Sequence, residues 1–238
     1  MNTYLLIHGA WHGAWCWDKV IPILEKQGHK VIAPDLPGHG KDKIPVKEVS
    51  LKAYTDYICE IIDSLEEQVI LVGHSMGGLI MSQVAEYRSN KIEKLVYIAA
   101  FVLKNEESIL PFIRKDAESL LIHNIEFSKD MSSIRLNENE IKNVFYGDCS
   151  DEDISRAKSL VSPQSFAPIK ARLNITNEKF ERVPKIYIEC LRDKAISITM
   201  QRKMYAEFSW QKVLSMDSSH SPFFSSPKAL VSKITMVF

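Results

Sequence analysis

The sequence has little that would tie the chain to a nucleic acid or a membrane. Lys plus Arg and Asp plus Glu number 30 each, so the net charge is zero and no field attracts a polyanion. No apolar run approaches the roughly 20 residues needed to cross a bilayer. The four cysteines include no C-x-x-C pair of the kind that indicates zinc or redox chemistry. We therefore expect neither nucleic acid nor membrane as a partner.

The cysteines and the start of the chain indicate a reducing compartment. Cys16, Cys59 and Cys190 lie in apolar or amphipathic stretches, which favours buried free thiols over disulfides. The segment Met1–His8 has no basic region and too short an apolar run for a signal peptide. We expect a cytoplasmic protein of one large domain with a modest insertion, and leave a homodimer open.

Short apolar segments alternate with helical patterns through most of the chain. Strands are expected at 4–7, 30–33, 69–72, 95–100, 185–191 and 211–216. Helices are expected at 15–27, 51–65, 79–87 and 197–208 and after Pro227. Continuously apolar strands separated by helices predict an α/β fold, with a mostly parallel sheet covered by helices on both faces.

The alternation breaks between about Leu103 and Arg182. This segment is polar, mostly helical in pattern and poor in strand signals. We expect a core of residues 1–102 and 183–238 and a mainly helical cap of residues 103–182 that sets substrate choice. Apolar side chains that could line the underside of the cap, or pack a core of its own, are Phe112, Ile113, Leu120, Leu121, Phe145 and Phe166.

The strongest motif is Gly73-His74-Ser75-Met76-Gly77-Gly78, directly after one expected strand and directly before a helix. This is G-x-S-x-G in the strand–turn–helix context that exposes a nucleophilic serine. The glycines are needed because the turn is sharp and side chains there would collide with the neighbouring backbone. We interpret Ser75 as the nucleophile and His74 as part of the substrate pocket; the alternative is a merely structural turn.

A nucleophilic serine needs a base, and the base needs an orienting acid. In this strand–turn–helix architecture the chain order is Ser, acid, His, and His220 is the only histidine after the insertion. Asp193 follows the strand at 185–191, whose carboxyl end should lie near the loop of His220. Asp217 competes for the same role but precedes His220 by only three residues. We favour Asp193.

The loop after the first strand should supply part of an oxyanion hole. The backbone N–H groups of Met76 and Ala10 are the candidates, and Gly9 lets the loop approach a substrate closely. Trp11 is interpreted as a pocket wall, with burial in the core as the alternative.

Two patterns argue against bound cofactors. His8 and His12 are four residues apart, but no helix aligns them and no carboxylate motif accompanies them, so we expect no metal there. Gly38 and Gly40 form no G-x-G-x-x-G dinucleotide motif, and the chain has no phosphate-binding loop.

Four blocks of the sequence, at 6–17, 72–78, 187–196 and 219–222, carry a family resemblance. The chain resembles α/β-hydrolases, and among them small plant methylesterases and hydroxynitrile lyases together with bacterial pyrethroid- and salicylate-type esterases. The resemblance implies an esterase with a triad of Ser75, Asp193 and His220 and no cofactor. It thins over about 103–160.

The resemblance leaves three functions to distinguish: ester hydrolysis, cyanohydrin cleavage by a lyase, and ligand binding with little turnover. The lyases of the group carry Thr or Asn at the position of Gly9, and one branch has Lys where this chain has Ser221. Both positions favour a serine hydrolase that cleaves a small apolar or aryl carboxylic ester through an acyl-enzyme. A low-turnover binding or receptor protein with the same pocket is the alternative from another class.

Overall fold

The computed structural model describes residues 1–236, whose centre is a six-stranded sheet. All neighbouring strands are parallel, in the order β2-β1-β3-β4-β8-β9. The strands are β1 (Thr3–Ile7), β2 (Lys30–Ile32), β3 (Val69–His74), β4 (Ile92–Ile98), β8 (Lys185–Cys190) and β9 (Lys212–Met216). This confirms the predicted parallel sheet, and every residue of β1, β3 and β8 is buried, including Lys185 and Glu189 of β8.

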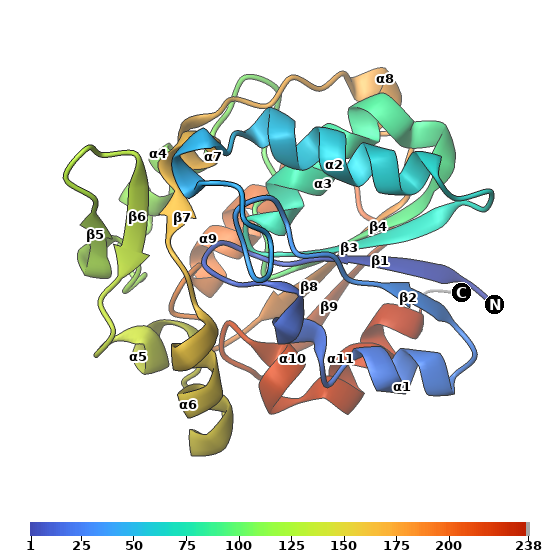
Figure 1. The fold of residues 1–238 in the computed structure, drawn as a ribbon. Coiled ribbons are helices and arrows are strands. Elements are labelled where there is room, and N and C mark those ends of the chain that lie inside the picture. Colours follow the sequence, from blue (N-terminus) through green and yellow to red (C-terminus); the bar gives the residue numbers. More distant parts are fainter. Residues whose placement is uncertain (237–238) are drawn as a thin grey trace.

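Helices cover both faces of this sheet. Figure 1 shows α2 and α3 on one face and α1 and α11 on the other. The helices outside the 103–182 segment are α1 (Ile21–Lys26), α2 (Leu51–Asp63), α3 (Gly77–Arg88), α9 (Ile198–Tyr205), α10 (Pro222–Ser225) and α11 (Pro227–Thr235). Short 3₁₀ turns are η1 (Ala14–Trp17), η2 (Val46–Glu48) and η3 (Ser89–Lys91). Within residues 1–236, none of the helices combines the length and apolarity that a membrane span requires.

The expectation of one helix over 15–27 was wrong. The chain instead forms η1 and then the short helix α1, and Pro22 stands in its first turn. Proline lacks a backbone N–H, so it is tolerated at a helix start and cannot continue an earlier helix. Gly28, with φ of 82°, follows as the chain turns into β2.

The segment between β4 and β8 contains a second sheet that the sequence analysis missed. Strands β5 (Ile125–Phe127), β6 (Ser133–Leu136) and β7 (Gln164–Ser165) pair antiparallel. They have only two to four residues each, too short for a periodic pattern. The other elements are α4 (Ile109–Lys115), η4 (Ile122–Asn124), α5 (Ile141–Phe145), α6 (Asp151–Leu160), α7 (Phe166–Lys170) and α8 (Asn177–Phe180). The division into domains at residues 103 and 182 stays a prediction.

One hydrophobic cluster joins this segment to the main sheet. The six apolar side chains considered for the underside of the cap all belong to it or pack against it. Four of the six, including Phe145 and Phe166, are buried. These six residues therefore form no separate small core, and their place on the underside of a cap stays a prediction. The cysteines are free thiols as expected: Cys16, Cys59 and Cys190 are buried and Cys149 is half-buried.

Candidate active site

Ser75 lies in a strained turn between β3 and α3. Its φ is 55°, in the left-handed region, and the residue is 9% exposed. A Cβ on Gly73 would stand 2.9 Å from the backbone of Gly77, and one on Gly77 would stand 2.7 Å from the carbonyl oxygen of Ile7. Only glycine fits at both positions, as the motif predicted. Helix α3 begins directly after the turn, so its positive end lies beside Ser75.

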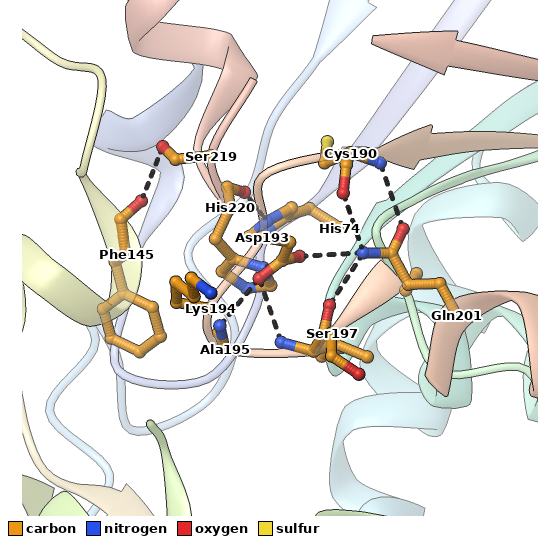
Figure 2. Close-up of polar contacts among 12 residues, drawn as sticks. His74, Phe145, Cys190, Asp193, Lys194, Ala195, Ser197, Gln201, Ser219 and His220 are labelled. Carbon is orange, nitrogen blue, oxygen red and sulfur yellow. Dashed lines mark hydrogen bonds and ion pairs between the residues drawn. The ribbon is translucent and has the colours of Figure 1, made fainter. Parts of the chain in front are cut away.

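His220 and Asp193 form a buried hydrogen-bonded pair. The distance between His220 Nδ1 and Asp193 Oδ2 is 2.7 Å, and both side chains are at most 1% exposed (Figure 2). Asp193 follows β8 and His220 follows β9, so the parallel strands bring both to the same edge of the sheet. With Nδ1–H donating to the carboxylate, Nε2 of a neutral imidazole is left as an acceptor.

The carboxylate of Asp193 is fixed by donors on all sides. Oδ1 accepts from the backbone N–H groups of Ala195 at 2.7 Å and Ile196 at 2.9 Å. Oδ2 accepts from the Gln201 amide at 3.1 Å as well as from His220. With four donors around it, the acid cannot rotate without losing hydrogen bonds.

Gln201 is a site residue that the sequence analysis missed. It is fully buried on α9, and its amide nitrogen also donates to the carbonyl of Ile196 at 2.8 Å. Its amide oxygen accepts from the backbone N–H of Cys190 at 3.1 Å (Figure 2). The sequence did contain one signal for Gln201. Its amide lies on the same helix face as Met204, a face that packs inward, and a buried amide needs hydrogen-bond partners.

Asp217, the competing acid, has a different environment. Its side chain is 78% exposed and pairs with Arg192, with 2.7 Å between Oδ1 and Nε. The structure therefore brings Asp193, and not Asp217, to the imidazole of His220.

His74 contacts His220 through a hydrogen bond and through its ring. Its Nε2–H donates to the carbonyl oxygen of His220 at 2.8 Å, and the two rings lie 4.4 Å apart between centroids. Burial and the neighbouring histidines hold the pKa of His74 well below its usual value, so this imidazole is neutral. His74 is fully buried, and its hydrogen bond holds the loop of His220; its expected place in the substrate pocket stays a prediction.

The loop after β1 lies directly on the serine turn. A Cβ on Gly9 would stand 2.9 Å from Ser75 Cβ. Within residues 1–236, the backbone N–H groups of Ala10 and Met76 have no hydrogen-bond acceptor, which is the condition an oxyanion hole requires. Trp11 has φ of 63° and is 4% exposed, and its indole N–H donates to the carbonyl of Ile134 on β6 at 3.1 Å. This tryptophan anchors the loop to the 103–182 segment.

His8 and His12 are each engaged within the protein. Both ring nitrogens of His8 hydrogen-bond to backbone groups. Those of His12 bond to the carbonyl of Ala10 and to the hydroxyl of Tyr146. Burial lowers the pKa of His12 to about 4. In the described part of the chain, no three His, Cys, Asp or Glu residues form a group that could hold a metal ion.

The 103–182 segment holds the loop that carries Asp193. The Asp116 carboxylate accepts from the N–H of Ser197 at 2.8 Å, and the N–H of Leu120 donates to the carbonyl of Lys194 at 2.8 Å. The hydroxyl of Ser119 donates to the carbonyl of Ala195 at 2.8 Å. Three backbone positions beside the acid thus depend on side chains or backbone of this segment.

A parallel sheet with a strained serine turn at the end of β3, and a His–Asp pair beyond β9 and β8, defines an α/β-hydrolase fold. The sequence profile described as the alpha/beta hydrolase family matches residues 4–233, and the chain belongs to this family.

Similar proteins carry names of esterases and of a binding protein. Salicylic acid-binding protein 2 of Nicotiana tabacum is 35% identical, over 84% of this chain and 82% of that protein. A pyrethroid hydrolase of Sphingobium wenxiniae is 33% identical, over 98% and 86%. The crystal structure of a pyrethroid hydrolase from Sphingobium faniae has a TM-score of 0.89 at 30% identity, covering 99% of this chain and 96% of that one.

Some relatives are longer than this chain. Two Arabidopsis thaliana proteins, named as chloroplastic methylesterases 11 and 15, are 34% and 30% identical. The chain spans 62% and 55% of their lengths.

Proposed function

We propose that the chain is a serine esterase that cleaves small apolar or aryl carboxylic esters. The observation that carries the proposal is the buried 2.7 Å contact between His220 and Asp193, at the same sheet edge as the strained turn of Ser75. A histidine oriented by a buried carboxylate is the usual means of activating a serine hydroxyl. The names of the similar proteins, pyrethroid hydrolase and methylesterase, support ester hydrolysis.

In the proposed reaction, His220 Nε2 takes the hydroxyl proton of Ser75 while Oγ attacks the carbonyl carbon of the ester. The negative charge that develops on the carbonyl oxygen is stabilised by the N–H groups of Ala10 and Met76. The imidazolium, held by Asp193, then gives its proton to the departing alcohol and leaves an acyl-enzyme. Water attacks this second ester with His220 again as base, which releases the carboxylic acid and restores the Ser75 hydroxyl.

The surroundings of the base favour an apolar substrate. The ring of Phe145 stacks on that of His220 at 5.5 Å between centroids, and the serine turn contacts the Gly9 loop. An apolar wall beside the reacting groups suits acyl or aryl groups without charge. The zero net charge of the chain supplies no field that would attract an ionic substrate.

Ligand binding without turnover is the second candidate function, because one relative is named salicylic acid-binding protein 2. Cyanohydrin cleavage has less support. The lyases of the group carry Thr or Asn at the position of Gly9, where a Cβ would stand 2.9 Å from Ser75 Cβ.

The test is hydrolysis of p-nitrophenyl acetate and of a panel of methyl and aryl esters by the wild type, Ser75→Ala and His220→Ala. We expect either substitution to lower kcat by about 10³-fold or more, because the triad acts as a unit. Retention of more than about a tenth of the rate by Ser75→Ala would remove Ser75 from the mechanism. Binding of salicylate by a wild type that hydrolyses no ester would favour the second candidate, and cyanide release from mandelonitrile would favour the lyase.

A further inference from the structure

The turn between α5 and α6 lies against the loop that carries His220. The Asp148 carboxylate accepts from the backbone N–H of Ser219 at 2.9 Å through Oδ2, and from the hydroxyl of Ser219 through Oδ1. Its side chain is 12% exposed, and Arg192 Nη2 lies 3.4 Å from Oδ2. One carboxylate of the 103–182 segment thus accepts from both hydrogen-bond donors of the residue that precedes the histidine.

The end of α5 and the turn that follows it make further contacts around His220. Phe145, three residues before Asp148, stacks its ring on the imidazole, at 5.5 Å between centroids and 27° between planes. Its carbonyl also accepts from the hydroxyl of Ser219, as Figure 2 shows. The thiol of Cys149 lies 3.9 Å from the carbonyl oxygen of Ser221. Contacts therefore reach the imidazole and the residues on both sides of it.

Two other contacts hold this loop, and neither offers an acceptor to the N–H of Ser219. His74 fixes the carbonyl of His220, and the N–H of Arg192 donates to the carbonyl of Ser218 at 3.0 Å. The Ser218 carbonyl and the Ser219 N–H belong to the same planar peptide group. Arg192 holds its oxygen, and Asp148 is the sole acceptor within residues 1–236 for its N–H. Loss of Asp148 would leave the Ser218–Ser219 peptide group held through its carbonyl alone, and the N–H of Ser219 without an acceptor.

We propose that Asp148 is a positioning residue for His220, so that the angle of the imidazole toward Ser75 depends on how the 103–182 segment sits on the sheet. This inference rests on the proposed function of His220 as the base. A carboxylate suits the role because it accepts two donors at once, and hydrogen bonds to a charged acceptor are shorter and stronger than neutral ones. The contact with Arg192 offsets part of the cost of burying the charge.

The test compares Asp148→Ala, Asp148→Asn and Ser219→Ala with Asp151→Asn as the matched control. Asp151 is an acid of the same segment, but its side chain is 94% exposed and pairs only with Lys142 among the described residues. We expect Asp148→Ala to lower kcat by about 10- to 100-fold with little change in KM, because small misplacements of a reacting group cost on that order. Asp148→Asn keeps one acceptor and should lose less, and Asp151→Asn should match the wild type.

A double-mutant cycle separates positioning from general damage. Because the Ser219 hydroxyl bonds to Asp148 as well as to the carbonyl of Phe145, the effect of Ser219→Ala should be smaller in Asp148→Ala than in the wild type. Active sites are counted with a fluorophosphonate that labels Ser75, so that kcat refers to folded enzyme. The NMR signal of the proton between His220 Nδ1 and Asp193 should shift or broaden in Asp148→Ala and stay unchanged in Asp151→Asn.

The proposed function and the positioning role of Asp148 would be overturned by different results. A wild type that is neither labelled at Ser75 nor active on any ester would overturn the proposed function. A wild type that is active, beside an Asp148→Ala that is less heat-stable but has unchanged kcat per labelled site and an unchanged His220 signal, would overturn the positioning role alone. Additive effects of Asp148→Ala and Ser219→Ala would also overturn it.

Discussion

The main sheet and the 103–182 segment contribute different things to the same site. The sheet supplies the proposed reacting groups, since Ser75, Asp193 and His220 follow β3, β8 and β9 at one edge. The segment supplies contacts that hold two of the loops, through Asp116 at the acid and Asp148 at the base. Reacting groups thus come from the part with regular sequence patterns, and much of their support comes from the part without them.

The largest expected effect is on kcat, and it distinguishes Asp193 from Asp217 as the acid that orients His220. Asp193→Asn keeps the shape of the side chain but removes the charge that orients the imidazole and stabilises its protonated form. We expect kcat to fall by about 10²- to 10⁴-fold in ester hydrolysis. Asp217→Asn should stay within about threefold of the wild type, because the Asp217 side chain is 78% exposed and pairs with Arg192. A reversed ranking would reassign the acid.

Gln201 provides a smaller test on the sheet side. Gln201→Leu removes one donor from Asp193 and leaves buried backbone groups of Cys190 and Ile196 without partners. We expect kcat to fall about tenfold and the protein to lose about 1–3 kcal/mol of stability. Gln83→Leu is the matched control, because Gln83 is a buried glutamine that bonds both backbone groups of Asn174. It should lower the Tm similarly and leave kcat unchanged; equal losses of kcat in both variants would argue for general damage.

Exchange of the segment tests whether it also chooses the substrate. A chimera that carries residues 103–182 of a related esterase should change the order of kcat/KM across an ester panel by about tenfold for some substrates. The chimera must retain an acid at the position of Asp148, so that the base stays supported. A folded and active chimera with an unchanged preference order would assign specificity to the loops of the sheet.

The prediction with the smallest effect on turnover concerns acid stability and belongs to the sheet side. Burial lowers the pKa of His12 and of His39 to about 4, below the usual 6.5. The unfolded chain binds these protons first, so stability is full above pH 6.5 and falls toward pH 4, by about 1.4 kcal/mol per pH unit for each histidine. Urea unfolding followed by tryptophan fluorescence between pH 7.5 and 4.5 measures the slope. His39→Gln should flatten it, whereas substitution of the exposed His123 should not.

The sequence predicted those parts of the site that depend on neighbours along the chain. The turn of Ser75 follows from Gly73 and Gly77, and the strands that end before Asp193 and His220 follow from their apolar runs. Gln201 and Asp148 act on atoms that lie near in space but belong to other elements. The helical spacing of Gln201 and Met204 indicates only that Gln201 faces inward, and no local pattern shows which groups either side chain binds. Strand β7, with two residues, exists because it pairs with β6 and has no signal of its own.

The φ of 55° at Ser75 determines which substitution selection for heat resistance would favour at this position. A side chain in the left-handed region costs on the order of 1 kcal/mol, and glycine would relieve that strain. A screen that rewarded stability alone would therefore favour Ser75→Gly and lose the nucleophile in the same step. Only a screen that also demands turnover would keep serine, which makes this turn a place where stability and activity are selected in opposite directions.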